Sequence, residues 1–413
     1  MGDSVSDSAT ATNTSPRRID DLDALRGFAL LGILMVNIGA FASGYYGVGL
    51  ADPAFDRPLD RFMLALVRVL FETKFYLLFS FLFGYSFTLQ MASAQRAQQP
   101  FAPRYLRRSA GLLLLGMGHA VLLFHGDILV TYALLGLVLL ALRGLKPRSA
   151  IKWALTLVGV TALCWALLGW VLIGVGDFLP VQQIHDEVAR ATAAYRGSIA
   201  ATIGQHIYEL QSSVWFALAL VQAPCALAMF YLGLAAAKSN FFNGLSSKRR
   251  QLWQTLLIGA SVGLAGALGY SYFNATPTLI GQSALGLALG ILTAPALACA
   301  YVAALLLALH SAQGASLGAW LAPAGRMALT NYLMQSLVCA VLFTAWGWGL
   351  IGRLSPLTVS LIAVAIYLAQ LGLSRWWMRH HVYGPIEWLL RALTHWHWPV
   401  WHKDPPMAGQ MPD

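Results

Sequence analysis

Long apolar runs, each ended by a short polar or basic segment, repeat along almost the whole chain. A helix of about 20 apolar residues is long enough to cross the hydrocarbon core of a bilayer. By length and apolar character, ten such runs predict membrane-spanning helices. They lie at about residues 20–42, 62–91, 105–125, 127–143, 151–175, 213–237, 252–273, 281–309, 325–349 and 357–378. We therefore expect an all-α fold, a polytopic integral membrane helical bundle of about ten transmembrane helices.

The second run is too long for one crossing, and Glu72 and Lys74 divide it. We expect an interfacial helix before this pair and the true span after it, through Phe79–Gln90. On that span Ser80 and Gly84 are four residues apart, a spacing of small residues that lets two membrane helices approach closely.

The composition agrees with a membrane protein. Hydrophobic residues make up 58% of the chain and charged residues 11%, whereas soluble domains carry about 25% charged residues. The net charge of +10 is then first a topology signal, so a lipid bilayer is the expected partner and nucleic acid is not. No nucleotide-binding loop or Ser–His–Asp signature is evident, which disfavours primary pumps and hydrolases. The oligomeric state stays unknown from the sequence.

Basic residues concentrate in alternate loops between the predicted spans. Because cytoplasmic loops carry an excess of Lys and Arg, this pattern places both termini in the cytoplasm. The clusters are Arg96, Arg104, Arg107 and Arg108; Arg143, Lys146, Arg148 and Lys152; Lys238, Lys248, Arg249 and Arg250; and Arg375 and Arg379.

The same pattern divides the chain into four segments. A disordered cytoplasmic tail at 1–18 precedes an N-terminal transmembrane bundle at 19–240. A C-terminal transmembrane domain at 241–393 precedes an aromatic and His-rich cytoplasmic tail at 394–413. The loop 177–212 would lie outside as one or two amphipathic helices, either a solvated cap or part of a mouth for an acceptor.

The first span carries polar residues into the apolar run. Arg26 would lie about one turn inside the hydrocarbon, and Asp23, three residues earlier, is its local partner. Asn37 projects within roughly 20° of Arg26 and about 16 Å higher along the helix. This face could be a positive anchor with an interhelical hydrogen bond, or the polar lining of a site.

The third span ends in GHAVLLFHGDIL. His119 lies at a depth close to that of Asn37, and an ionisable residue within a span is a functional candidate. It could instead be a neutral histidine that bonds a backbone carbonyl. Asp127 could cap the next span or orient a histidine.

The ninth span opens with GRMALTNYLMQS. Arg326 would enter the membrane on the same side as Arg26, and Asn331 and Gln335, one turn apart, share a face. Two helices with an arginine at one depth need partners inside the bundle, water or an anionic ligand.

The C-terminal segment predicts a short interfacial helix, in which Glu387 stabilises the first turn and pairs with Arg391. His395, His397 and His402 could bind a metal, but interface residues in a tail are the better interpretation, so we predict no metal site.

Five segments resemble the YeiB family of bacterial inner-membrane proteins. They are LDALRGFALLGILMVN, KFYLLFSFLFG, GHAVLLFHGDILVTYALLG, GRMALTNYLMQS and YGPIEWLLR. The resemblance covers roughly residues 20–393, and the family carries the domain of unknown function numbered 418 (DUF418) in its C-terminal half. It implies a multi-pass bundle of the ten-helix type in the bacterial inner (plasma) membrane.

The opening LDALRG is also similar, more weakly, to the membrane acyltransferase-3 superfamily, which moves acyl groups from a cytoplasmic donor to sugars or other acceptors. That superfamily pairs an arginine with a histidine eleven residues later. Arg26 matches the arginine, but Asn37 stands at the second position, as in the heparan glucosaminide acetyltransferase branch. That branch has its working histidine in the first outer loop. Residues 43–61 contain no histidine, which leaves His119 as the only histidine expected to be buried among the early helices.

The first functional hypothesis is a membrane acyltransferase. His119 would be the general base on an acceptor hydroxyl, oriented by Asp127. An acyl-CoA-type donor would be the substrate, with no further cofactor. The expected substrate-binding residues are Arg26 and Arg326, which would bind phosphates, and Asn37, Asn331 and Gln335.

The second hypothesis is a transporter or permeation pathway for a lipid-linked or small organic solute. The amides within the spans favour it, as do Pro224 and Pro295 as helix breaks. A scaffold without chemistry of its own is the third.

Overall fold

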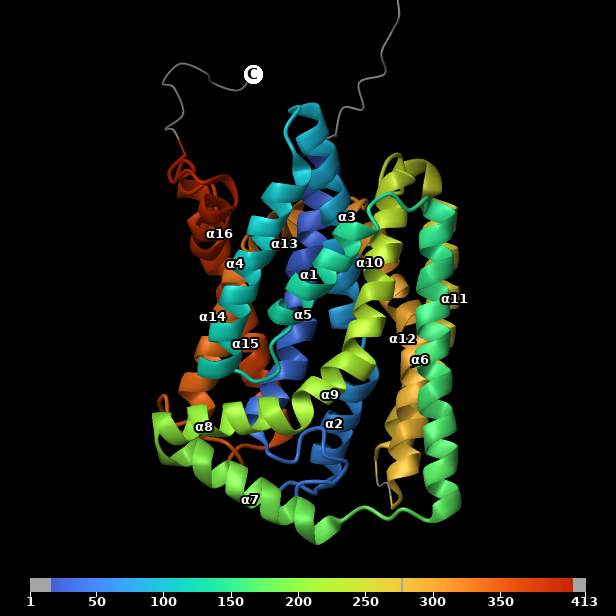
Figure 1. Cartoon of the computed structure of the whole chain (residues 1–413), viewed down its shortest axis with the longest axis vertical. Coiled ribbons are helices and arrows are strands. Elements are labelled where there is room, and N and C mark those ends of the chain that lie inside the picture. Colours follow the sequence, from blue (N-terminus) through green and yellow to red (C-terminus); the bar gives the residue numbers. More distant parts are fainter. Residues whose placement is uncertain (1–15, 276–277, 404–413) are drawn as a thin grey trace, which may run out of the picture.

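The computed structural model describes residues 16–275 and 278–403, which form one bundle of helices (Figure 1). Most of the predicted tail at 1–18 and the end of the tail at 394–413 lie outside the described residues. The helical elements are α1 (Pro16–Ala42), α2 (Pro58–Leu70), α3 (Phe75–Arg96), α4 (Phe101–Leu122), α5 (Leu129–Ala141), α6 (Pro147–Val175), α7 (Val181–Gly197), α8 (Ile199–Glu209), η1 (Leu210–Val214), α9 (Trp215–Ala217), η2 (Leu218–Gln222), α10 (Ala223–Lys238), η3 (Leu245–Lys248), α11 (Arg249–Phe273), α12 (Ile280–Leu309), α13 (Gly314–Arg326), α14 (Ala328–Phe343), α15 (Pro356–His380) and α16 (Pro385–His395).

Six of the described helices are long and apolar enough to cross a membrane, or seven if the bent pair α13–α14 is one span. They lie at Asp20–Ala42, Pro147–Val175, Trp215–Lys238, Arg249–Phe273, Ile280–Leu309 and Pro356–His380. The other predicted spans fall on α3, α4 and the 13-residue α5. The protein is an all-α polytopic membrane protein, as the apolar pattern predicts.

The break in the second apolar run is confirmed. Helix α2 ends at Leu70 and α3 begins at Phe75, with Glu72 and Lys74 between them. The small residues on α3 have the expected effect, since a Cβ on Gly84 would lie 2.2 Å from the Phe230 carbonyl oxygen of α10.

The ninth predicted span differs from the expectation. Helices α13 and α14 meet at a bend of 77°, and Arg326 ends α13 instead of opening a straight span at 325–349. In a continuous helix the amides of Leu329 and Thr330 would donate to carbonyls four residues earlier. Here both donate to the carboxylate of Glu387 in α16, at 2.6 and 3.1 Å. A contact far along the chain stabilises the break, so local pattern could not reveal it.

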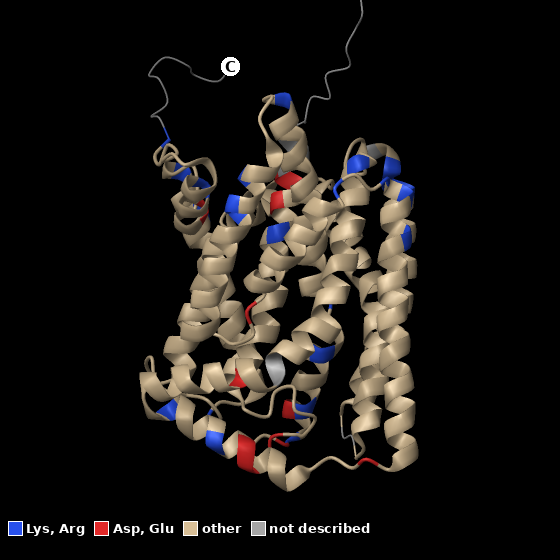
Figure 2. Cartoon of the chain, in the orientation of Figure 1, with Lys and Arg blue, Asp and Glu red and all other residues tan. Residues whose placement is uncertain are grey.

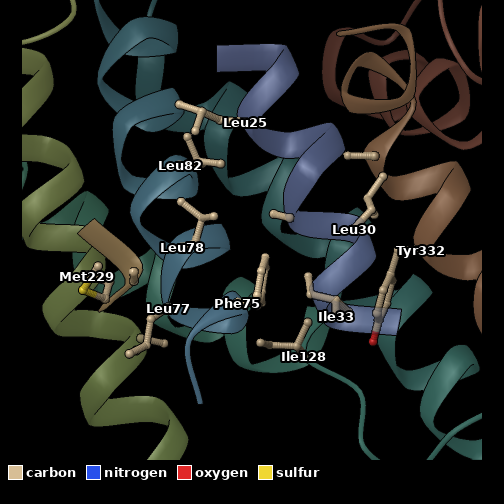
Figure 3. Close-up of a cluster of buried hydrophobic side chains, with 14 of the residues drawn as sticks. Leu25, Leu30, Ile33, Phe75, Leu77, Leu78, Leu82, Ile128, Met229 and Tyr332 are labelled. Carbon is tan, nitrogen blue, oxygen red and sulfur yellow. The ribbon is translucent and has the colours of Figure 1, made fainter. Parts of the chain in front are cut away.

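Helix α1 lies within the bundle and packs against α13, α14, α15 and α3. Its crossing with α13 is close because both helices carry glycine there: a Cβ on Gly27 would lie 2.2 Å from the Leu321 carbonyl oxygen. Figure 3 shows the apolar core around α1, with Leu30, Ile33, Phe75 and Tyr332 among its buried side chains. On the other side of the molecule, α6, α11 and α12 pack together, and α10 joins them to α3 (Figure 1).

The two ends of the bundle differ in charge (Figure 2). The end where the described chain begins and where α16 lies, here called the terminal end, gathers Lys and Arg. At the opposite end, here called the loop end, acidic and basic residues are mixed, and α7 and α8 lie across it (Figure 1). One or two amphipathic helices were expected in 177–212, and the structure has two there, α7 and α8. The predicted division at 240/241 stays a prediction.

Candidate functional site

His119 and Asp127 form a buried pair between α4 and α5. The His119 Nδ1 lies 2.7 Å from Asp127 Oδ1, and Asp127 Oδ2 accepts a hydrogen bond from the Val130 amide at 2.7 Å. Asp127 therefore caps α5 with one carboxylate oxygen and orients the His119 imidazole with the other. Gly116 permits this approach, because a Cβ there would lie 2.9 Å from Asp127 Oδ2.

The second ring nitrogen of His119, Nε2, has no hydrogen-bond partner among the described residues. Since a carboxylate accepts, His119 Nδ1 donates, and Nε2 keeps a free lone pair. His119 Nε2 and the Tyr332 hydroxyl are both buried without a hydrogen-bond partner among the described residues. Their rings lie with centroids 5.0 Å apart. Each buried unsatisfied polar group costs about 1–3 kcal/mol, so the pair is suited to a ligand that supplies the missing bonds.

A cavity of about 440 Å³ lies on the terminal side of this pair and ends on Tyr332. His119 and Asp127 are not among the described residues that line it, so the Tyr332 ring stands at the border between cavity and imidazole. Apolar residues of α1, α3, α4 and α5 form the inner wall. The lining includes Leu30, Ile33, Leu82, Leu112, Ile128 and Leu129 there, and Arg26, Arg104, Arg108, Arg326, Arg391 and His395 nearer the terminal end.

Arg26 and Arg326, the two arginines predicted to bind phosphates, both lie beside the carboxylate of Asp23. Asp23 pairs with Arg26 and also lies 3.5 Å from Arg326 Nε. Arg326 NH2 reaches Asp20 at 2.9 Å, and Arg26 NH2 donates to Ser86 Oγ at 2.5 Å. The two predicted phosphate-binding arginines are thus already paired within the protein.

Three other arginines of the cavity are not neutralised. Arg104, Arg108 and Arg391 have no carboxylate within 4.0 Å in the part of the chain that the structure describes. Among the residues that the structure describes, the Nε of Arg108 is buried without a hydrogen-bond partner. The Arg391 guanidinium lies over the Tyr383 ring, 4.9 Å from its centroid. The cavity therefore carries unpaired positive charge that suits a multiply charged anion.

Glu387, which also lines the cavity, is occupied with α14. Besides two amides, it accepts a hydrogen bond from Thr330 Oγ1 at 2.5 Å. The expected ion pair with Arg391 is wrong, because the carboxylate points to the end of another helix. Burial raises the pKa of Glu387 above its ordinary value, although its hydrogen bonds to Thr330 and Leu329 act in the opposite direction.

The three predicted amides lie elsewhere. Asn331 donates to the Ala324 carbonyl at 3.1 Å and to Ser374 Oγ at 2.9 Å, and Gln335 donates to Gln370 Oε1 at 2.8 Å. These bonds join α14 to α13 and α15. Asn37 is partly exposed on α1, and neither it nor the other two is among the residues that line the cavity. The structure does not bring them to His119.

Sequence reasoning missed Tyr332 and the unpaired arginines. The charge pattern presents Arg104 and Arg108 only as topology signals, although two arginines four residues apart on one helix face repel each other and need an anion nearby. Tyr332 lies inside the motif GRMALTNYLMQS, but no local feature distinguishes it from a packing tyrosine.

A second histidine–carboxylate pair lies at the loop end. His125 Nδ1 is 2.6 Å from Glu209 Oε2, which also accepts from Tyr195 OH at 2.7 Å. His206 of α8 bonds the Val121 carbonyl at 3.0 Å, and burial lowers the pKa of His206 to about 4. These contacts hold α7 and α8 over the loop end.

The described residues contain no group of three or more His, Cys, Asp or Glu side chains that could hold a metal ion. This range includes His395, His397 and His402.

Comparison with known proteins identifies relatives along nearly the whole chain. The uncharacterized protein YxaH of Bacillus subtilis (strain 168) is 32% identical over 403 residues, which cover 94% of this chain and 96% of YxaH. The uncharacterized protein YeiB of Escherichia coli (strain K12) is 28% identical over 397 residues, 90% of this chain and 95% of YeiB. Residues 236–397 match the family described as a protein of unknown function (DUF418). The chain therefore belongs to the YeiB-like family of DUF418 proteins.

Proposed function

We propose that this protein is a transmembrane acyltransferase that moves an acyl group from a phosphate-bearing donor, entering at the terminal end, to an acceptor hydroxyl. One observation carries the proposal: a cavity with unpaired arginines is lined by Tyr332, which also packs against His119 of the His119–Asp127 pair.

The arginines favour a donor of the acyl-CoA type. Arg104, Arg108 and Arg391 offer planar donors for phosphate oxygens, and the apolar inner wall suits a less polar arm that carries the acyl thioester. Arg26 and Arg326, held by Asp23, form one side of the same cavity and add positive charge without being its main ligands.

The chemistry assigned to His119 is general base catalysis. Its Nε2 takes the proton from the acceptor hydroxyl as the oxygen attacks the thioester carbonyl carbon. The carbon–sulfur bond then breaks, and the departing thiolate takes that proton to leave as a thiol. Asp127 holds the imidazole with Nδ1 protonated and stabilises the imidazolium that forms. An ester and a thiol are the products.

The alternative is a transporter for a lipid-linked or small organic solute, and the bent pair α13–α14 is the feature that a transporter would share. Broken helices form substrate sites in many transporters, where the amides of a half-helix bind the solute. In this structure Glu387 occupies those amides, which supports the enzyme over the transporter.

The proposed setting is the bacterial inner membrane with both termini in the cytoplasm. The four basic clusters flank helix ends at the terminal end (Figure 2), as the excess of Lys and Arg in cytoplasmic loops requires. The donor would then come from the cytoplasm and the acceptor from the loop end.

The test uses the full-length protein in proteoliposomes with radiolabelled acetyl-CoA and a bacterial envelope extract as the source of acceptors. We expect release of free thiol and transfer of label, both reduced about 10²–10⁴-fold in His119→Gln. His185→Gln is the matched control, because His185 lies at the loop end, where it bonds Tyr45 at 2.7 Å. Movement of label across the bilayer without thiol release would replace the enzyme with the transporter.

A further inference from the structure

We propose that the Tyr332 hydroxyl donates a hydrogen bond to the carbonyl oxygen of the donor's acyl group and stabilises the oxyanion that forms there. This assignment rests on the proposed function and names the residue that would hold the reacting carbonyl.

Tyr332 is the residue that joins the two halves of the site. It lines the inner end of the cavity and packs against His119, with ring centroids 5.0 Å apart. Figure 3 shows its ring beside Ile33 of α1, another residue that lines the cavity. A thioester lying along the apolar wall would therefore reach the phenol at the point nearest the imidazole.

The hydroxyl is free to donate. It is buried and has no hydrogen-bond partner within the described residues. It faces the backbone of Ile128, and an amide there could only donate toward the phenol oxygen, which leaves the phenolic proton available. A neutral phenol that is already in place and dry needs no reorganisation when charge develops on the carbonyl oxygen.

Three other tyrosines line the cavity and do not fit this role. Tyr383 packs under the Arg391 guanidinium, which lies 4.9 Å from its ring centroid. The Tyr132 hydroxyl is bonded to Ser80 Oγ at 2.7 Å and to the Tyr76 carbonyl at 3.1 Å. The Tyr105 hydroxyl has no hydrogen-bond partner in the described part of the chain, but Tyr105 lies 14 residues before His119 on α4, about 21 Å along the helix. Tyr105 therefore offers a matched control: the same group in the same cavity, away from the imidazole.

The position of Tyr332 is fixed by the bend between α13 and α14. It lies five residues after Met327, where α13 ends and α14 begins, and the adjacent Asn331 carbonyl accepts a hydrogen bond from Gln370 Nε2 at 3.0 Å. The preceding turn is held by Glu387. Loss of the hydroxyl should not disturb this scaffold, so Tyr332→Phe tests the donor alone.

The experiment has a readout that does not depend on turnover. The probe is an acetyl-CoA analogue with a methylene group in place of the thioester sulfur and a ¹³C-labelled carbonyl. Its infrared carbonyl band is recorded on the full-length protein in nanodiscs. We expect the band at lower wavenumber in the parent than in Tyr332→Phe, and no change in Tyr105→Phe. In transfer from acetyl-CoA, kcat of Tyr332→Phe should fall roughly 10²–10³-fold with KM changed by less than about twofold.

Each outcome decides. An identical band and an identical kcat in Tyr332→Phe overturn the role of Tyr332 and leave the acyltransferase proposal standing. If the parent binds the analogue but its carbonyl band lies at the same wavenumber as in Tyr332→Phe, the role of Tyr332 is also overturned, whether or not transfer is found. A parent that does not bind the analogue overturns both.

Discussion

Glu387 caps a helix other than its own: its Oε2 accepts a hydrogen bond from Thr330 Oγ1 of α14 at 2.5 Å. Its Oε1 accepts the amides of Leu329 and Thr330. One carboxylate thus stabilises the 77° break between α13 and α14 and fixes α16 against the cavity.

Removal of this cap should destabilise the bundle at one point. Glu387→Ala leaves two amides and a hydroxyl without their partner, so we expect a loss of about 1–3 kcal/mol. Glu387→Gln keeps an amide oxygen as acceptor and should lose less. Melting of the purified protein in detergent measures both. Equal melting temperatures for parent and Ala variant would show that water replaces the carboxylate.

The same residue predicts a pH dependence. Burial raises the pKa of Glu387 in the folded protein above its ordinary value of 4.5, so folding favours the protonated carboxyl. Its contribution to stability is then fully present below pH 4.5 and is lost as the pH rises through the folded pKa. We expect the melting temperature of the parent, relative to the non-titrating Glu387→Gln, to fall as the pH is raised from about 4. A difference that is constant with pH would contradict the raised pKa.

The bend illustrates what the sequence could and could not predict. Apolar runs are a property of each segment, so the all-α class, the break at Glu72–Lys74 and the helices of the 177–212 segment followed from the pattern. The site depends on long-range contacts. His119 and Asp127 are eight residues apart and were both candidates, whereas Tyr332 and Arg391 reach the cavity only through packing of distant helices.

The polar residues at one depth were a weaker guide. Asn37 had a predicted depth close to that of His119, and Asn331 and Gln335 were predicted on one face above Arg326, but depth along a helix does not define the direction in which a side chain points. Asn331 and Gln335 satisfy buried groups between helices, which is the common use of amides in a membrane bundle.

Arg108 should contribute more to donor binding than Arg26. Its Nε has no hydrogen-bond partner within the described ranges, whereas Arg26 is already bonded to Asp23 and Ser86. We expect Arg108→Gln to weaken acetyl-CoA binding about tenfold, the loss of one charge-assisted contact of about 1.4 kcal/mol. Equilibrium binding of the radiolabelled donor measures it.

Arg26→Lys provides the contrast. Lysine cannot bond Asp23 and Ser86 with two separate nitrogens, so we expect a lower melting temperature with nearly unchanged donor affinity. If Arg26→Lys alone loses the donor, phosphate binding belongs to the arginine that the sequence first indicated.

The orientation in the membrane can be tested independently of activity. Reporter fusions at Ser198, between α7 and α8, and at Ser246, between α10 and α11, lie at opposite ends of the bundle. We expect reporter activity typical of the periplasm at Ser198 and of the cytoplasm at Ser246, because the basic cluster before α11 faces inward. The reverse result would place the donor cavity outside and exclude a cytoplasmic donor.

The sharpest test of the imidazole is made through Asp127. In Asp127→Asn the side-chain oxygen can still accept the Val130 amide at the start of α5, so the helix cap and the melting temperature should change little. The amide nitrogen of Asn would then face Nδ1 as a donor, which favours the tautomer with the proton on Nε2. That histidine cannot accept a proton from the acceptor, and we expect kcat to fall about 10²–10⁴-fold with donor affinity preserved. Asp127→Ala removes cap and orientation together and should lower both melting temperature and kcat. If Asp127→Asn keeps full activity while Asp127→Ala only melts earlier, Asp127 is a helix cap and His119 is a packing histidine.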